Sequence, residues 1–245
     1  MNTDIIPNNL RTYVSPLYWK IRSMWMSPYT SYSIDCFELK LHTSKPIECR
    51  SINTTINTER DFLEDFATRI RSSDVVYDIG SNVGIFACLS ALCGADVTAF
   101  DPLPANAKRI QENMSLNKVE GKVVEAALSD NDGKSTFDVS EALVGADQGK
   151  LVKNGGIEVT TYRGETYIQE NDQPTVLKMD VEGAEGAVLK GFGERLGECR
   201  LVYIERHHNK MDESPEKVID LLHDCGFRVN TIVDRGHQDI IMGSK

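Results

Sequence analysis

Short apolar runs alternate along the chain with segments in which apolar residues recur every three or four positions. The runs, rich in β-branched residues, predict buried strands, and the wider spacing predicts amphipathic helices. We expect strands at 75–78, 95–100, 122–127, 175–179, 201–205, 227–233 and 239–242, the last folding back on its predecessor as a hairpin. We expect helices at 59–71, 85–93, 104–117, 184–190 and 215–225. Strands and helices that alternate through short connections predict an α/β fold with a doubly wound, mainly parallel sheet.

Two regions depart from this alternation. Residues 1–32 hold both tryptophans and four of the eight tyrosines, with a helical spacing of apolar residues, and strands are expected at 34–41 and 46–50. We interpret residues 1–50 as an N-terminal extension, a helix plus short strands, packed on a main domain at 51–245. A homodimer contact or a membrane-surface arm is the alternative for the aromatic segment. Residues 129–173 resemble an insertion, with strands expected near 135–139 and 157–162.

Composition limits the kinds of partner. The 245 residues carry a net charge of −10, which disfavours extended contact with nucleic acid. No apolar run approaches the roughly 20 residues of a membrane helix, and no secretory signal is recognisable. Six cysteines without metal-ligand spacing fit reduced thiols and a cytoplasmic location. We therefore expect no nucleic-acid partner, no transmembrane segment and no resident metal.

The run VVYDIGSNVG, residues 75–84, predicts a strand, a tight loop and a helix start. Asp78 ends the strand, where an open α/β sheet binds ligands, and Gly80 and Gly84 allow a ligand to approach the backbone. Asp101 ends the next strand, where a carboxylate can accept both hydroxyls of an adenosine ribose. The loop lacks the middle glycine of the GxGxxG dinucleotide fingerprint. A cofactor without a pyrophosphate, such as S-adenosylmethionine, therefore fits better than a nicotinamide dinucleotide.

Two further motifs place acids at strand ends. KMDVEGAE puts Asp180 and Glu182 on the expected cofactor edge, while Glu185 is as easily explained as a charge at a helix start. YIERHH puts Glu205 and His207 at the end of the next strand. We expect Asp180, Glu182, Glu205 and His207 to form the catalytic group. His208 is a weaker candidate.

Taken together, these motifs resemble the FkbM-type family of S-adenosylmethionine-dependent methyltransferases. The similarity rests on DIGSNVGIF, FDPLPANAKRIQENMSLNKV, EAALSDNDG, KMDVEGAEGAVLKG and YIERHH in that order and covers about residues 55–245. It implies the class I methyltransferase (Rossmann-like) fold, with seven strands in the order 3-2-1-4-5-7-6 and the last antiparallel. It also implies the following cofactor-binding positions: Asp78, Gly80, Ser81, Asn82, Gly84, Asp101, Pro102, Ala127, Leu128 and Asp180.

The expected reaction is methyl transfer from S-adenosylmethionine to a hydroxyl of a sugar, glycan or natural product. Asp180 or Glu182 would orient the reactants, and His207 or Glu205 would accept the proton. A metal bridging Asp180, Glu205 and His207 is a less favoured variant. The competing interpretations are a nicotinamide-dependent oxidoreductase and a non-catalytic S-adenosylmethionine-binding module.

Overall fold

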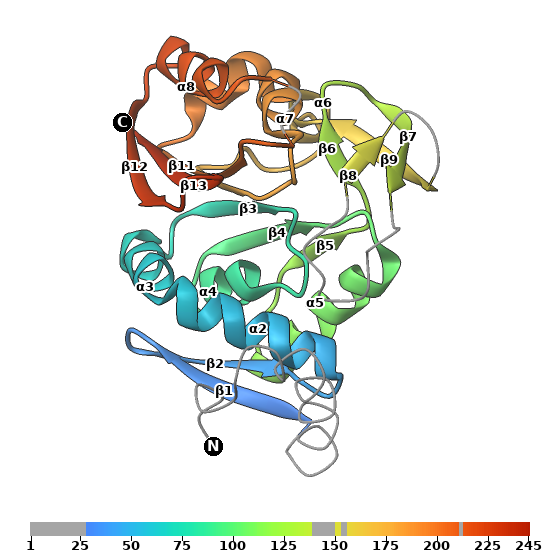
Figure 1. Cartoon of the computed structure of the whole chain (residues 1–245), viewed down its shortest axis with the longest axis vertical. Helices are drawn as coiled ribbons and strands as arrows, with labels where there is room; N and C mark the ends of the chain where they lie inside the picture. Colours follow the sequence, from blue (N-terminus) through green and yellow to red (C-terminus); the bar gives the residue numbers. More distant parts are fainter. Residues whose placement is uncertain (1–27, 139–149, 153–155, 211–212) are drawn as a thin grey trace.

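A seven-stranded sheet forms the centre of the molecule in a computed structural model that describes residues 28–138, 150–152, 156–210 and 213–245 (Figure 1). Its strands, from one edge to the other, are β12 (Arg228–Asp234), β13 (Gln238–Ser244), β11 (Leu201–His207), β10 (Val176–Met179), β3 (Val75–Ile79), β4 (Asp96–Phe100) and β5 (Lys122–Val124). Six of these strands run in the same direction, and β13 runs antiparallel to them. Counted along the chain, the order is 3-2-1-4-5-7-6. The predicted fold class, strand order and terminal hairpin are confirmed.

Helices cover both faces of this sheet, which explains why its central strands are apolar throughout. All four residues of β10 are buried. One face packs against α3 (Arg60–Arg69), α4 (Ile85–Leu92) and α5 (Pro104–Asn117). The other packs against α6 (Gly164–Ile168), α7 (Glu185–Phe192), the 3₁₀ helix η2 (Gly193–Glu198) and α8 (Pro215–Asp224). The five helices expected from the sequence are present, with ends within two residues of the prediction.

The N-terminal region differs from the prediction. The expected strand at 34–41 is a hairpin, β1 (Tyr29–Ile34) and β2 (Phe37–His42), because Asp35 turns the chain in the left-handed region at φ 49°. The expected strand at 46–50 is wrong, since these residues begin the helix α2 (Pro46–Thr58). Pro46 is compatible with a helix there because a first-turn residue has no intrahelical N–H bond to lose. The aromatic helix and the homodimer contact expected within 1–32 fall mostly outside the described residues.

The hairpin packs on the outer side of the helices that cover one face of the main sheet (Figure 1), and its buried residues and those of α2 belong to the same apolar cluster as that face. Ile52 and Ile56 of α2 are buried in the same cluster as the strands. A buried ion pair fixes α2 against α5, because Arg109 donates to both carboxylate oxygens of Glu48 at 2.8 and 3.1 Å. Packing therefore continues across the boundary expected at residue 50.

A second, four-stranded sheet follows β5. It contains β6 (Ala127–Ser129), β9 (Ile157–Arg163), β7 (Gly133–Asp138) and β8 (Lys150–Val152), in that order. The strand expected at 122–127 is therefore two strands in different sheets, with the chain leaving the main sheet after Val124. The strands expected in the insertion correspond to β7 and β9. This sheet carries Phe137 to the carboxyl end of the main sheet, where it lines a pocket.

Candidate active site

The loop after β3 is held in a tight conformation. Gly80, Asn82 and Gly84 have φ of 76°, 53° and 83°, in the left-handed region that glycine and asparagine tolerate best. A Cβ at Gly80 would lie 1.8 Å from the carbonyl oxygen of Asp180, so only glycine lets the loop pass this close to the end of β10. Ser81 Oγ donates to Asp78 Oδ2 at 2.6 Å, tying the loop to the strand before it.

Asp101, at the end of β4, organises the same loop from the other side. It accepts the backbone N–H groups of Asn82 and Leu103, each at 2.9 Å, and the side-chain amide of Asn106 at 3.2 Å. Burial raises the pKa of Asp101 to about 7, although the three hydrogen-bond donors stabilise the carboxylate and act to lower the pKa. Asp101 is thus a hydrogen-bond acceptor held in a fixed position next to the loop.

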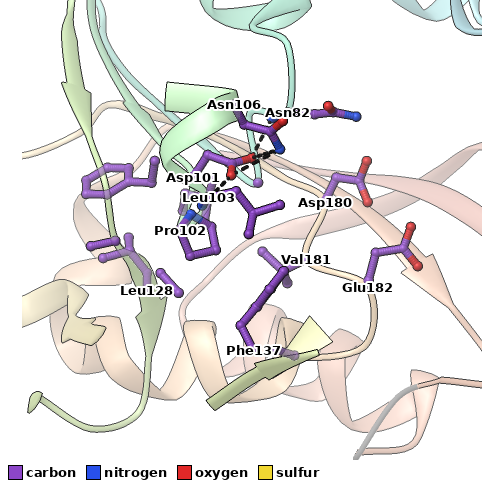
Figure 2. Close-up of a pocket in the computed structure, with 16 residues that line it drawn as sticks. Asn82, Asp101, Pro102, Leu103, Asn106, Leu128, Phe137, Asp180, Val181 and Glu182 are labelled. Carbon is purple, nitrogen blue, oxygen red and sulfur yellow. Dashed lines mark hydrogen bonds between the residues drawn. The ribbon is translucent and has the colours of Figure 1, made fainter. Parts of the chain in front are cut away.

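A pocket of about 80 Å³ opens beside Asp101 (Figure 2). Its apolar wall includes Pro102, Leu128, Phe137 and Val181. Figure 2 shows Pro102 and Leu128 on one side of the view and the carboxylates of Asp180 and Glu182 on the other. The pocket therefore offers apolar surface for a flat ring and carboxylates for hydroxyl or ammonium groups.

A second, more polar cavity of about 310 Å³ lies on the other side of the loop. One wall is the hydroxyl-bearing face of α2, with Ser51, Thr54, Thr55 and Thr58. The cavity is otherwise lined largely by charged and polar groups at the ends of β10 and β11 and in the turn between β12 and β13. Four residues line both this cavity and the first pocket, which identifies the place where the two meet: Gly80, Asn82, Asp180 and Glu182.

Lys178 lies beneath this junction. Its ammonium is 3.7 Å from Asp180 Oδ2 and 4.0 Å from Asp78 Oδ1, and it lies over the ring of Phe86 at 4.6 Å. Burial opposes its charge, but Asp180, Asp78 and further carboxylates outweigh burial and raise the pKa of Lys178. Lys178 is therefore a permanent cation that holds two carboxylates in place. Lys178 precedes Asp180 by two residues, the spacing that places side chains on one face of an extended chain, so the sequence does contain a signal for this contact.

His207, at the end of β11, faces three carboxylates. Its Nε2 lies 3.6 Å from Glu182 Oε1, and its Nδ1 lies 3.7 Å from Glu185 Oε1 and 4.0 Å from Asp180 Oδ1. Burial favours the neutral ring, but these carboxylates outweigh burial and raise the pKa of His207 to about 9. In the free protein at neutral pH the ring is therefore an imidazolium and has no lone pair with which to accept a proton.

Glu205 occupies the floor of the polar cavity. Burial, reinforced by the charges of Asp180 and Glu59, raises the pKa of Glu205 to about 8. Gln238 donates to Glu205 Oε1 at 2.8 Å, and Arg235 lies 3.7 Å from the same oxygen while pairing with Glu59 at 3.2 Å. A carboxyl group with this pKa can exchange a proton near neutral pH.

The structure brings most of the predicted site residues together. Asp180, Glu182, Glu205 and His207 all line the polar cavity. Those predicted to bind the cofactor and found lining the apolar pocket are Gly80, Asn82, Asp101, Pro102, Ala127, Leu128 and Asp180. Ser81 lines the polar cavity instead, whereas Asp78 and Gly84 line neither and support the loop from behind.

Other lining residues were not predicted. Glu59 and Arg235 come from segments distant in sequence, with no local signal of a site, and the α2 face was missed because α2 was not recognised. The sequence did not decide whether Glu185 is only a charge at a helix start or part of the site. Its side chain is fully buried and accepts a hydrogen bond from the N–H of Gly183 at 3.0 Å.

The strand order with its single antiparallel strand, and a pocket and cavity that meet at the carboxyl ends of the parallel strands, define a class I methyltransferase. The chain belongs to the methyltransferase FkbM domain family, whose model matches residues 78–229. The resemblance seen in the motifs is confirmed, and membership makes the protein a methyltransferase. The oxidoreductase and the non-catalytic module are set aside.

Three characterised proteins with similar sequences are also named as methyltransferases. A hexuronic acid methyltransferase (AglP) of Haloferax volcanii is 28% identical over 76% of this chain and 77% of its own. A 31-O-demethyl-FK506 methyltransferase (FkbM) of Streptomyces tacrolimicus is 28% identical over 74% of this chain and 83% of its own. A 2-O-methyltransferase (NoeI) of Sinorhizobium fredii is 30% identical over 60% of this chain and 70% of its own. In the part of the chain that the structure describes, no helix is long and apolar enough to cross a bilayer.

Proposed function

We propose that the protein transfers a methyl group from S-adenosylmethionine to a hydroxyl of a sugar, glycan or related natural product. The observation that carries this proposal is the junction at Gly80, Asn82, Asp180 and Glu182, where the apolar pocket and the polar cavity share a wall. A donor in one and an acceptor in the other would meet there.

The chemistry of the pocket fits this donor. Asp101 stands where it can accept ribose hydroxyls, and Pro102, Leu128 and Phe137 offer an apolar slot for the adenine ring. Within the described residues, Asn106 Oδ1, on a side chain that lines this pocket, is a buried acceptor without a hydrogen-bond partner. Such an atom requires a donor, and the cofactor's hydroxyl, amino and ammonium groups are donors.

The polar cavity fits an acceptor rich in hydroxyl groups. The threonines of α2 can both donate and accept hydrogen bonds, as a sugar does. The names of the relatives point the same way, since one acts on a hexuronic acid and two are named for O-methylation or for an O-demethyl substrate. The precise acceptor is a matter for screening, because a fold does not fix a substrate.

The chain's own groups supply orientation and a proton acceptor. When bound, the cofactor supplies an activated methyl group, which the acceptor oxygen must approach in line. Asp180 and Glu182, at the junction, orient the acceptor hydroxyl. Glu205, on the cavity floor, accepts the hydroxyl proton in its ionised form as the new O–CH₃ bond forms, because its pKa of about 8 lies below the value of about 9 for His207, so Glu205 ionises first as the pH rises.

The test is formation of S-adenosylhomocysteine from S-adenosylmethionine in the presence of a panel of neutral sugars, uronic acids and polyketide alcohols. We expect product with at least one acceptor, with the methyl group on oxygen by mass spectrometry and NMR. Glu205→Gln should reduce turnover by about 100-fold or more, the range of general base catalysis. Methyl transfer to nitrogen or carbon, or full turnover by Glu205→Gln, would contradict the proposal.

A further inference from the structure

Carboxylates outnumber cations where the pocket and the cavity meet. Glu59, Asp180, Glu182 and Glu205 line the cavity, and Asp78 and Glu185 lie directly behind it against Lys178 and His207. The lysine and arginine side chains that line it are Lys178, Lys210 and Arg235. With protonated His207 as a fourth cation, six acidic side chains still face four cations, and the excess grows when His207 loses its proton, so the region favours an additional cation.

Three of these side chains have the spacing of a metal site. Asp180, Glu182 and His207 each present one ligand atom, and these atoms lie within 4.8 Å of one another. The 3.6 Å between His207 Nε2 and Glu182 Oε1 is too long for a hydrogen bond. An ion about 2.1 Å from both atoms, the usual metal–ligand distance, would span this gap with an angle of about 118° at the ion.

The neighbouring lysines leave the required atoms open. Lys178 lies against Oδ2 of Asp180, and Lys210 is 2.5 Å from Oε2 of Glu182. The other oxygen of each carboxylate faces the ring of His207: Glu182 Oε1 lies 3.6 Å from Nε2, and Asp180 Oδ1 lies 4.0 Å from Nδ1. The lysines therefore fix the two carboxylates without occupying the oxygens that an ion would use.

Unpartnered buried atoms provide independent support. Within the described residues, His207 Nδ1 and Asp180 Oδ1 have no hydrogen-bond partner, and His207 is only 9% exposed. Fully buried Glu185 lies on the Nδ1 side of the ring. A histidine that binds a metal through one nitrogen typically turns the other toward a carboxylate, and His207 stands between Glu182 and Glu185 in this way.

We propose that Asp180, Glu182 and His207 bind one divalent cation of the Mg²⁺ or Mn²⁺ class, with remaining positions open toward the cavity. Two carboxylates and one imidazole suit such an ion, which takes the place of the proton on His207 Nε2 when it binds. This differs from the expectation of no metal and from the variant that included Glu205, because the cluster with metal-ligand spacing contains Glu182 in place of Glu205. Binding of the ion does not depend on the proposed function. Its role rests on that function: the ion would coordinate the acceptor hydroxyl and lower its pKa.

The test uses the full chain, stripped with EDTA and dialysed, with Mn²⁺ as the probe. Loss of the free Mn²⁺ signal in electron paramagnetic resonance should show one bound ion per chain, and the bound spectrum should show coupling to one ¹⁴N nucleus. Asp180→Asn and Glu182→Gln should each weaken binding at least 10-fold. His207→Gln should also abolish the ¹⁴N coupling.

His208→Gln is the matched control, because Nε2 of His208 lies 3.3 Å from Asp239 and outside the cluster. It should bind Mn²⁺ like the wild type, and circular dichroism should show that every variant is folded. Absence of binding below millimolar Mn²⁺, or equal binding by His207→Gln and His208→Gln, would overturn the site. Titration of S-adenosylhomocysteine in the presence of EDTA separates the two proposals. If the nucleoside binds in this titration but the stripped chain takes up no Mn²⁺, only the metal site is rejected. If the chain takes up Mn²⁺ but does not bind the nucleoside, only the proposed function is rejected.

Discussion

At the scale of single residues, burial and neighbours give similar carboxylates different tasks. Asp101 is surrounded by N–H donors and suits hydroxyl recognition, whereas Asp78 is enclosed with Ser81 and Lys178 and holds the loop. Glu205 has a raised pKa and suits proton transfer. The sequence predicts that acids stand at these strand ends, but their division of labour depends on contacts that only the fold creates.

Gly80 is required by space as well as by backbone angle. Gly80→Ala should abolish cofactor binding and lower the melting temperature by several degrees, because the new Cβ would collide with the backbone of Asp180. Gly236→Ala is the matched control, since Gly236 has nearly the same φ, 78°, and nothing within 4 Å of an added Cβ. It should carry only the backbone strain, about 1 kcal/mol or slightly more. Equal melting temperatures for the two variants would show that the close approach at Gly80 is unimportant.

Asp101 should make cofactor affinity depend on pH. Its folded-state pKa of about 7 means that the ionised form, the stronger acceptor for ribose hydroxyls, becomes dominant as the pH rises through 7. Affinity for S-adenosylhomocysteine should therefore increase between pH 6 and pH 8 by up to about 10-fold, the effect of one charge-assisted hydrogen bond. Asp101→Asn should bind more weakly, with no such rise. Identical pH profiles for the two proteins would contradict the role given to Asp101.

At the scale of elements, α2 shows where sequence reasoning succeeds and where it fails. Helices with a clear apolar stripe, such as α3 and α5, are predictable because their periodicity is local. The run INTTINT in α2 is rich in β-branched and asparagine residues, which have weak helix propensity. Its helical form depends on contacts distant in sequence, including the burial of Ile52 and Ile56 and the Glu48–Arg109 pair. The hydroxyl-bearing wall that α2 contributes to the polar cavity was therefore missed together with the helix.

The hydroxyl face of α2 should contribute to acceptor binding. Thr55→Val removes one hydroxyl from the cavity while keeping the side-chain shape. We expect the KM for the acceptor to rise about 5-fold, the effect of losing one hydrogen bond, with the Kd for the cofactor unchanged. Thr68→Val makes the same change on α3, on an exposed threonine outside the cavity, and should leave both constants unchanged. An unaltered KM in Thr55→Val would remove α2 from the acceptor site.

At the scale of the whole molecule, the order of strands brings together motifs that are far apart in sequence. β10 lies between β3 and β11, so the loop after β3 meets Asp180, and Asp180 meets His207. The alternation of strands and helices is sufficient to predict this convergence, since parallel strands end at one edge of the sheet. The contributions of Glu59 and Arg235 could not be foreseen, because nothing local in the sequence shows that α3 and the β12–β13 turn border the same cavity.

The most direct test of the central claim is calorimetric titration of S-adenosylhomocysteine into the full chain, compared with Asp101→Ala and Asp96→Ala. Asp96 begins the strand that Asp101 follows, at the opposite end of the sheet, and is the matched control. We predict one site per chain in the wild type and in Asp96→Ala. Asp101→Ala should bind at least 10-fold more weakly, because it loses charge-assisted hydrogen bonds of about 1.5–3 kcal/mol each. No heat with the wild type, or equal affinity in all three proteins, would contradict the account.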